Sequence, residues 1–150
     1  MKTDLSLRPY WAGDWRAVRP RAELQVFSDL TIHHGLLDRA PSPDMVRART
    51  LCRNGRPIAS AGLFLQRAHL AEAWAMFAEP DPRATRMVVT AIREQLAEAV
   101  RDWSLTRIEA SCLADFPAGQ RFLTFLGFAP YAEARRRAGP HTEILMEYLP

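Results

Sequence analysis

The sequence predicts a single α/β (α+β) domain in which helices flank a mixed central sheet of about six to seven strands. The first observation is a short apolar strand, Glu72–Phe77, which runs through a proline-rich turn into a long amphipathic helix ending near Trp103. The second is the pair Asn54-Gly55, because both residues tolerate a positive φ and fit a two-residue turn between antiparallel strands. The length of 150 residues suits one core, so residues 1–150 are expected to form one domain.

Composition and charge narrow the classes of function. The chain is 48% hydrophobic and 25% charged, which is typical of a globular domain, and no apolar run approaches the roughly 18 residues of a membrane span. Its start, Met1–Ser6, lacks a basic segment followed by an apolar block, so we expect a protein that is not secreted. The net charge is only +3, because 17 acidic residues are spread among the basic ones. This charge distribution does not favour nucleic acid as a partner. The cysteines and histidines lack metal-ligand spacing, so no metal site is expected.

The N-terminal third alternates between strand and helix signals. Residues Asp4–Pro9 alternate apolar and polar side chains, which predicts a first strand. Asp14 is suited to capping a turn that leads towards Trp15, and Pro20 fits the first turn of a helix running to about Leu30. The segment 33–44 is rich in glycine and proline and predicts a loop.

The middle of the chain predicts three consecutive strands. From Met45 to Arg53 the period is two, and arginines on one side predict a wet, basic face. The second arm of the hairpin, Arg56–Gln66, is apolar, and its Gly62 marks either a bulge or a close approach by another backbone. The strand Ala71–Phe77 continues the meander into the long helix.

The C-terminal third predicts a parallel strand, a short helix and a closing hairpin. Thr106–Leu113 follows a crossover helix, so pairing parallel to the preceding strand is expected. A short helix opens near Asp115 and ends at Gly127, with Phe125 among its inward residues. The closing hairpin joins Tyr131–Arg137 to Thr142–Leu149, so the expected order is β-α-β-β-β-α-β-α-β-β. The predicted core includes Ile58, Trp74, Ile92, Leu96, Val100, Ile108, Phe122 and Leu126.

This order, the prolines before the long helix and the Leu126-Gly127-Phe128 segment resemble the GNAT superfamily of acyl-CoA-dependent N-acetyltransferases. The resemblance covers nearly the whole chain and implies a GNAT-like mixed sheet flanked by helices. A closer resemblance is to the GNAT-like proteins that tailed bacteriophages often encode. It is carried by the tryptophan at Ala73-Trp74, by the segment Arg121–Phe128 and by Gly139-Pro140 before the last strand.

The loop before the long helix departs from the pattern of active GNAT members. In those proteins Arg or Gln, two variable residues, Gly, one variable residue and then Gly or Ala let backbone amides approach the pyrophosphate of CoA. Here Arg83 matches the first position, but Arg86 and Val88 replace the small residues and are expected to crowd those amides. Arg83 and Arg86 are the candidates to bind phosphate by charge. The resemblance therefore implies a degenerate acyl-CoA loop.

The acid-base candidates implied by the resemblance are few. Many active relatives place a tyrosine three residues before the Leu of Leu-Gly-Phe, and this chain has Leu123 there. Glu72, on the central strand, is the candidate general base, with a solvated or salt-bridged carboxylate as the alternative. Trp74, Met76 and Phe77 are candidates for the acyl pocket, with ordinary sheet packing as the alternative. Asp115 is either a polar site residue or a helix N-cap.

Three hypotheses about function follow. In the first, the chain is a phage-type GNAT-like protein that is non-catalytic, needs no cofactor and is a structural component of a virion. Its partners are then other protein chains of an assembly, which cover the face of Arg47, Arg49 and Arg53 or the final strand, and its location is the cytoplasm or the virion. The alternative is an N-acetyltransferase that uses acetyl-CoA through an atypical pyrophosphate loop. A nucleic-acid-binding module, the third, rests only on arginine content, such as Arg135–Arg137.

Overall fold

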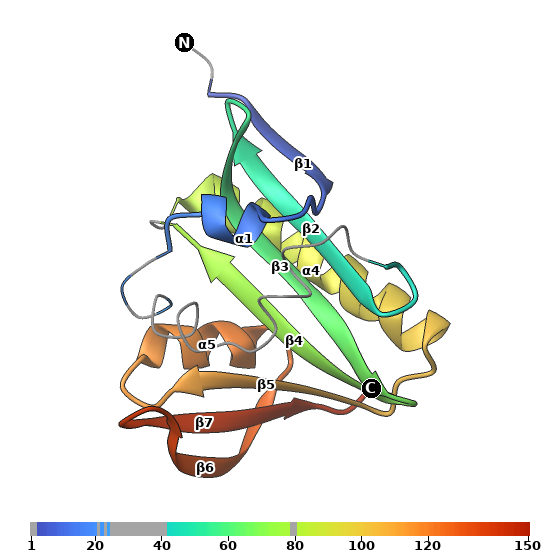
Figure 1. Ribbon diagram of the computed structural model, residues 1–150, viewed down its shortest axis with the longest axis vertical. Helices are drawn as coiled ribbons and strands as arrows, with labels where there is room; N and C mark the ends of the chain where they lie inside the picture. The colour runs from blue at the N-terminus through green and yellow to red at the C-terminus, as the bar shows by residue number, and fades with distance from the viewer. Residues whose placement is uncertain (1–2, 21, 23, 25–41, 79–80) are drawn as a thin grey trace.

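A computed structural model of the protein describes residues 3–20, 22, 24, 42–78 and 81–150. In this part of the chain, seven strands form one mixed sheet in the order β1-β2-β3-β4-β5-β7-β6 (Figure 1). The strands are β1 (Leu5–Pro9), β2 (Val46–Arg53), β3 (Arg56–Arg67), β4 (Leu70–Phe77), β5 (Arg107–Leu113), β6 (Ala129–Ala138) and β7 (His141–Tyr148). The helices are α1 (Asp14–Ala17), α4 (Pro82–Asp102) and α5 (Pro117–Phe125). The predicted fold class is confirmed.

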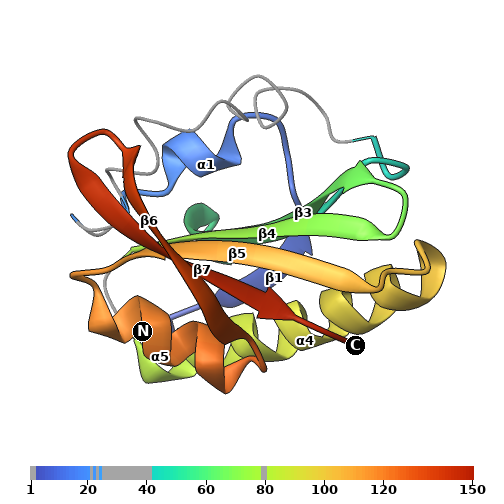
Figure 2. The ribbon, with the colours of Figure 1, turned by 90° about the horizontal axis from the view of Figure 1, so that it is seen from below.

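The sheet separates two layers. Helices α4 and α5 cover one face, and α1 lies on the opposite face (Figure 2). Successive side chains of a strand point to opposite faces, while registered neighbours on adjacent strands point to the same face. We call the two sides the α4 face and the α1 face. The α4 face carries Leu63, Ala71, Ile108 and Met146. The α1 face carries Ser60, Glu72, Trp74, Met76, Glu109, Ser111, Glu143 and Glu147.

The predicted turns and pairings are present. Asn54 and Gly55 have φ values of 49° and 79° and join β2 to β3 in antiparallel register. Strands β4 and β5 pair in parallel, as expected across a crossover helix. Gly62 marks a close backbone approach, because a Cβ there would lie 2.4 Å from the carbonyl oxygen of Arg47. The register shifts of β3 lie elsewhere, so the alternative of a bulge at Gly62 is wrong.

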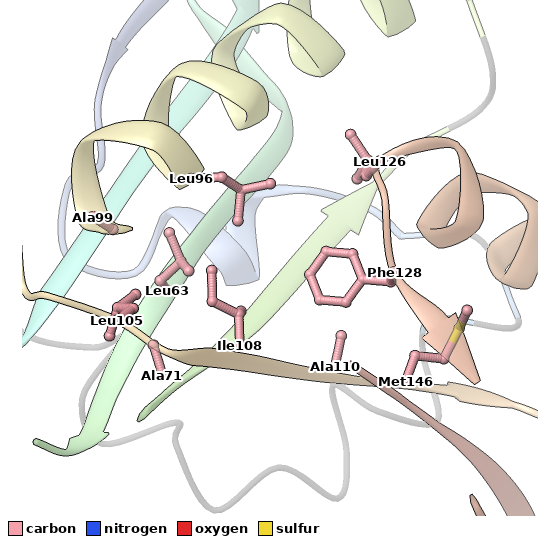
Figure 3. Packing of buried hydrophobic residues seen from close by; sticks show 10 residues of the cluster. All are labelled: Leu63, Ala71, Leu96, Ala99, Leu105, Ile108, Ala110, Leu126, Phe128 and Met146. Atoms are coloured by element: carbon pink, nitrogen blue, oxygen red, sulfur yellow. The ribbon is translucent and has the colours of Figure 1, made fainter. Parts of the chain in front are cut away.

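The main core lies between the sheet and α4 (Figure 3). Leu96 of α4 is 4% exposed and packs over strand residues such as Ile108, which is fully buried. Leu126 is also buried, so these three core predictions are confirmed. The other predicted core residues are half-buried and pack against the edges of the clusters: Ile58, Trp74, Ile92, Val100 and Phe122.

For the short helix, one prediction is wrong and one of the two alternatives for Asp115 is excluded. Phe125 was expected to face inward, but its side chain is 61% exposed, and Arg93 of α4 lies over its ring at 4.7 Å. Asp115 does not cap the helix, because the N-cap position belongs to Phe116 and no side chain there accepts a hydrogen bond. The amide of Phe116 bonds instead to the carbonyl oxygen of Leu113, which moves the helix start one residue past the carboxylate. Gly127, with φ of 104°, ends the helix as predicted.

The arginines of β2 do not form an open basic face. They point to the α4 face, where each pairs with a carboxylate on α4 or at its start. The pairs are Arg47–Asp102 at 2.7 Å, Arg49–Glu94 at 3.1 Å, Arg49–Glu98 at 3.8 Å and Arg53–Asp81. The prediction that this face is wet and available to another chain is corrected, since a helix of the same chain covers it.

A buried carboxylate joins α1 to the sheet. Asp14 is 6% exposed, and its oxygens accept hydrogen bonds from Arg8, from the amide of Trp11 and from the hydroxyl of Thr50 at 2.7 to 2.9 Å. Thr50 continues the network to Ser60 on β3 at 3.0 Å. Because every contact of the carboxylate is a donor, the network satisfies its charge inside the fold. The predicted helix Pro20–Leu30 and the predicted loop 33–44 lie largely outside the described residues.

Candidate functional site

The parallel strands β4 and β5 separate in the middle of the sheet. They pair only from Leu70–Arg107 to Glu72–Glu109. Beyond this point β4 stays paired with β3 as far as Phe77, and β5 stays paired with β7 as far as Leu113. The two arrows diverge in Figure 1, and α5 lies in the layer behind them. We call the stretch where Ala73–Phe77 of β4 and Ala110–Leu113 of β5 are not paired with each other the strand opening.

The strand opening leaves backbone groups of two inner strands without the partners that a continuous sheet would give them. Buried backbone N–H and C=O groups need hydrogen bonds from protein, water or a ligand. An extended ligand that carries amides can therefore add between the strands in the manner of a further strand. The opening is thus a feature of the backbone and does not depend on the loop motif.

The start of α4 is the second element of the site, and its amides are already occupied. Asp81 is the N-cap, and its Oδ1 accepts from the amides of Arg83 at 2.9 Å and Ala84 at 3.2 Å. Its carbonyl oxygen accepts from the amide of Thr85 at 2.8 Å, and Pro82 has no amide hydrogen. The amide of Ala84 contributes most to holding the pKa of Asp81 below its usual range, and the Arg83 amide and the Arg53 charge add to it. The helix start therefore carries its own anion.

This geometry corrects the reason given for a degenerate loop. Arg86 and Val88 were expected to crowd helix-start amides, but both residues lie inside α4, past its first turn. Val88 is 5% exposed and packs under the sheet, while the side chains of Arg83 and Arg86 are exposed. What fills the helix start is the Asp81 carboxylate, which Arg53 of β2 contacts from the side. The signal was present in the sequence, because Asp followed by Pro is a typical N-cap and N1 pair.

The predicted strand residues fall on both faces of the sheet. Glu72 lies on the α1 face at the last paired position before the strand opening, half-buried, with Gln66 donating to its carboxylate at 2.7 Å. Met76 is buried on the same face. Phe77 points to the α4 face, where its ring meets Phe122 of α5 edge to face at 5.1 Å. Of the residues predicted to line the acyl pocket, Met76 shares the α1 face with Trp74, whereas Phe77 lies on the α4 face.

Further polar groups flank the strand opening on the α1 face. Trp74 follows Glu72 on this face of β4, and its indole nitrogen is buried with no hydrogen-bond partner in the described residues. Ser111 is the equivalent residue of β5 and donates to Glu143 of β7 at 3.1 Å. Glu143 is 5% exposed. Sequence reasoning missed Ser111 and Glu143 because they are 32 residues apart and only the sheet register joins them.

The remaining candidates supply little chemistry. Leu123, half-buried, packs against the core from α5. Burial raises the pKa of the Cys112 thiol to about 11, and the Asp115 and Glu143 carboxylates raise it further, so a thiolate nucleophile is disfavoured at neutral pH. Within the described residues, no three His, Cys, Asp or Glu side chains gather closely enough to hold a metal ion. Over the same residues, no helix has the length and apolarity required to cross a bilayer.

Comparison with known proteins places the fold. No protein-family model and no curated protein sequence matches the chain. A solved N-acetyltransferase from Staphylococcus aureus is similar with a TM-score of 0.65 and 13% identity, over 97% of both chains. A spermidine/spermine N-acetyltransferase from Vibrio cholerae is similar with a TM-score of 0.63 and 13% identity, over 97% of this chain and 92% of that one. A chimera of a spermidine N-acetyltransferase from Vibrio cholerae gives a TM-score of 0.65 and 17% identity, over 97% and 95% of the chains. The chain has the fold of these N-acetyltransferases, the GNAT fold.

Proposed function

We propose that the chain is an acetyl-CoA-dependent N-acetyltransferase with an atypical pyrophosphate loop. The observation that carries the proposal is the strand opening, which follows the last parallel pair, Glu72–Glu109, and faces both layers of the fold. The pantetheine arm of CoA is an extended chain with amide groups, so it suits two strand edges that lack each other as partners. The transferred acetyl group then lies between β4 and β5.

The two faces of the sheet separate donor and acceptor in this proposal. The start of α4 and the ring of Phe77 lie towards the α4 face, so the phosphates of CoA belong there, with Arg83 and Arg86 as charged contacts. The acceptor amine belongs on the α1 face, where Glu72 is the candidate general base and Met76 is buried beside the opening. No step needs a metal ion, since the thioester is already activated towards an amine.

A second candidate function has its own supporting observations. The Asp81 carboxylate places a negative charge at the helix start, where it competes with the phosphates of CoA, and Leu123 offers no proton to a departing thiolate. Both features favour a non-catalytic component of an assembly, in line with the resemblance to the GNAT-like proteins of tailed bacteriophages. Exposed apolar side chains such as Trp11 and Leu149, each 62% exposed, are then candidates for contact with other chains.

Isothermal titration of the full chain with acetyl-CoA separates the two candidates. The enzyme proposal expects saturable binding, and release of the CoA thiol when an amine such as spermidine is added. The matched control ligand is 3'-phosphoadenosine 5'-diphosphate, because it keeps the 3'-phosphate and the pyrophosphate of CoA and lacks the pantetheine arm. It should bind more weakly than acetyl-CoA if the strand opening holds the arm. Equal binding of the two ligands, or no binding by either, would remove the enzyme proposal. The second candidate expects no binding together with recovery of the chain in a stable particle.

A further inference from the structure

Ser111 and Glu143 form a polar pair that none of the three hypotheses from the sequence uses. Ser111 is half-buried on β5 at the edge of the strand opening, on the α1 face. Glu143 lies on the neighbouring strand β7 and is 5% exposed. Its Oε1 accepts the Ser111 hydroxyl at 3.1 Å, and Arg137 Nε lies 3.1 Å from its Oε2. This Oε2 atom is buried, and within the described residues no donor, Arg137 included, meets it at the angle of a hydrogen bond.

The pair fixes the direction of the Ser111 hydroxyl. An ionised carboxylate only accepts hydrogen bonds, so Ser111 must donate its single proton to Glu143. The lone pairs of the Ser111 oxygen then remain for another group. Arg137 places a positive charge beside the other oxygen of Glu143. Ser111 is therefore held as a hydrogen-bond acceptor at the rim of the opening.

We infer that Ser111 accepts a hydrogen bond from the N–H of the acceptor amine and that Glu143 is the residue that positions it. This inference rests on the proposed function and adds a specificity device to it. A hydroxyl whose hydrogen is already bonded to a carboxylate can only accept a further hydrogen bond. It therefore favours a ligand group that donates, such as an amine or ammonium, over a group that only accepts. Trp74 lies on the same face of β4, the other strand of the opening, and packs against Tyr10 and Phe64; its buried indole N–H has no partner in the described residues.

The test measures binding and turnover separately in matched variants. Acetyl-CoA affinity is measured by titration, and the KM for spermidine and for 1,4-diaminobutane by thiol release. Ser111→Ala should raise the amine KM about tenfold, because a hydrogen bond to a charged group is lost, and should leave acetyl-CoA affinity unchanged. Ser111→Thr keeps the hydroxyl and should retain the KM. Glu143→Gln should act like Ser111→Ala, since the new amide donates to Ser111 and frees its proton.

The effects of Ser111→Ala and Glu143→Gln on the amine KM should not be additive. Because Glu143 acts through Ser111, the double variant should be no worse than either single variant. Glu147→Gln is the matched control, as Glu147 lies on the same strand and face but pairs with Arg107. Unchanged amine KM values in Ser111→Ala and Glu143→Gln, or additive losses in the double variant, overturn the inference while the enzyme proposal stands. A wild-type chain that does not bind acetyl-CoA overturns both.

Discussion

The two faces of the sheet are built differently. On the α4 face, buried aliphatic side chains form the main core and a second cluster near the start of α4, and the arginines of β2 pair with carboxylates of α4. On the α1 face an aromatic cluster around Trp74 and Phe64 lies beside buried hydroxyls and carboxylates, including Asp14 and Glu143. Buried carboxylates cost free energy unless donors or cations lie beside them. Asp14 accepts several hydrogen bonds, and Glu143 accepts one from Ser111 and has Arg137 beside its other oxygen.

The difference indicates where stability and chemistry reside. The α4 face holds the long helix in place, and the position of this helix sets the distance between its start and the strand opening. The α1 face tolerates polar groups that an apolar core would exclude. Functional sites are often built where local structure departs from what stability alone would select. The comparison therefore predicts that changes in the apolar core of the α4 face act on stability alone, whereas changes of charged or polar groups on the α1 face and on α4 have effects that depend on pH, salt or ligand.

The largest expected effect is on the α4 face. Leu96→Ala should lower the free energy of unfolding by about 2 to 5 kcal/mol, because Leu96 is 4% exposed and its loss leaves a cavity in the main core. Chemical denaturation followed by circular dichroism measures the change. Ala97→Gly, at the exposed neighbouring position on the same helix, should cost only about 1 kcal/mol. Equal losses in the two variants would mean that the core on this face does not dominate stability.

A smaller loss of stability, which depends on pH, is expected for a change on the α1 face. Burial would raise the pKa of Asp14, but hydrogen bonds from Arg8, Thr50 and the Trp11 amide outweigh it and hold the pKa below the usual value of 3.8. A lowered folded pKa means that the stabilisation is complete above pH 3.8 and is lost as the pH falls from there through the folded pKa. Asp14→Asn should cost about 1 to 3 kcal/mol at pH 7.

The loss of stability in Asp14→Asn should also depend on pH. Below the folded pKa of Asp14 the wild-type carboxylate is neutral, so the difference in unfolding free energy between wild type and Asp14→Asn should shrink as the pH falls below 3.8. Unfolding titrations at a series of pH values measure it. Asp115→Asn, which alters an exposed carboxylate without a capping role, serves as the control. A pH-independent difference would show that the Asp14 network does not depend on its charge.

Much of the fold was predictable from local patterns. Asn54-Gly55 specifies its turn through backbone preference alone, and the long helix shows its buried face through spacing. The exposure of Phe125 was not predictable, because a helix of nine residues covers too little of the sheet to bury its last turn. The pairing of the β2 arginines with α4 depends on how the helix crosses the sheet, which periodicity does not specify.

The candidate site was less predictable for a related reason. The resemblance pointed to β4 and the start of α4, and Asp81-Pro82 carried a readable capping signal. The contact between Arg53 and Asp81 and the pair of Ser111 with Glu143 depend on strand order and register, which the sequence does not state. Beyond Glu72, β4 stays paired with β3 and β5 stays paired with β7 while β4 and β5 separate, an arrangement that no local pattern of the sequence states. The roles of Glu72, Met76, Phe77, Arg83 and Arg86 remain predictions.

The next effect concerns ligand affinity at the start of α4. Asp81→Ser keeps an oxygen that caps the amides of Arg83 and Ala84 but removes the carboxylate charge. Acetyl-CoA should bind several-fold more tightly to this variant, because its phosphates no longer compete with a fixed anion. Asp102→Asn is the control, since that carboxylate lies at the other end of α4 and also pairs with an arginine of β2. Weaker binding to Asp81→Ser would indicate that the carboxylate organises the site instead of blocking it.

The smallest effect is expected from the exposed arginines of α4. Arg86→Gln should weaken acetyl-CoA binding by no more than about tenfold at low ionic strength, because an exposed charge acts on phosphate through water and is screened by salt. The difference from wild type should fall as salt is raised, which titrations at several salt concentrations measure. Arg101→Gln, on the same helix with a side chain 71% exposed, should leave the affinity unchanged. If Arg86→Gln abolished binding at every salt concentration, Arg86 would be a direct phosphate ligand. The anion site would then lie along the side of α4 rather than at the amides that Asp81 occupies.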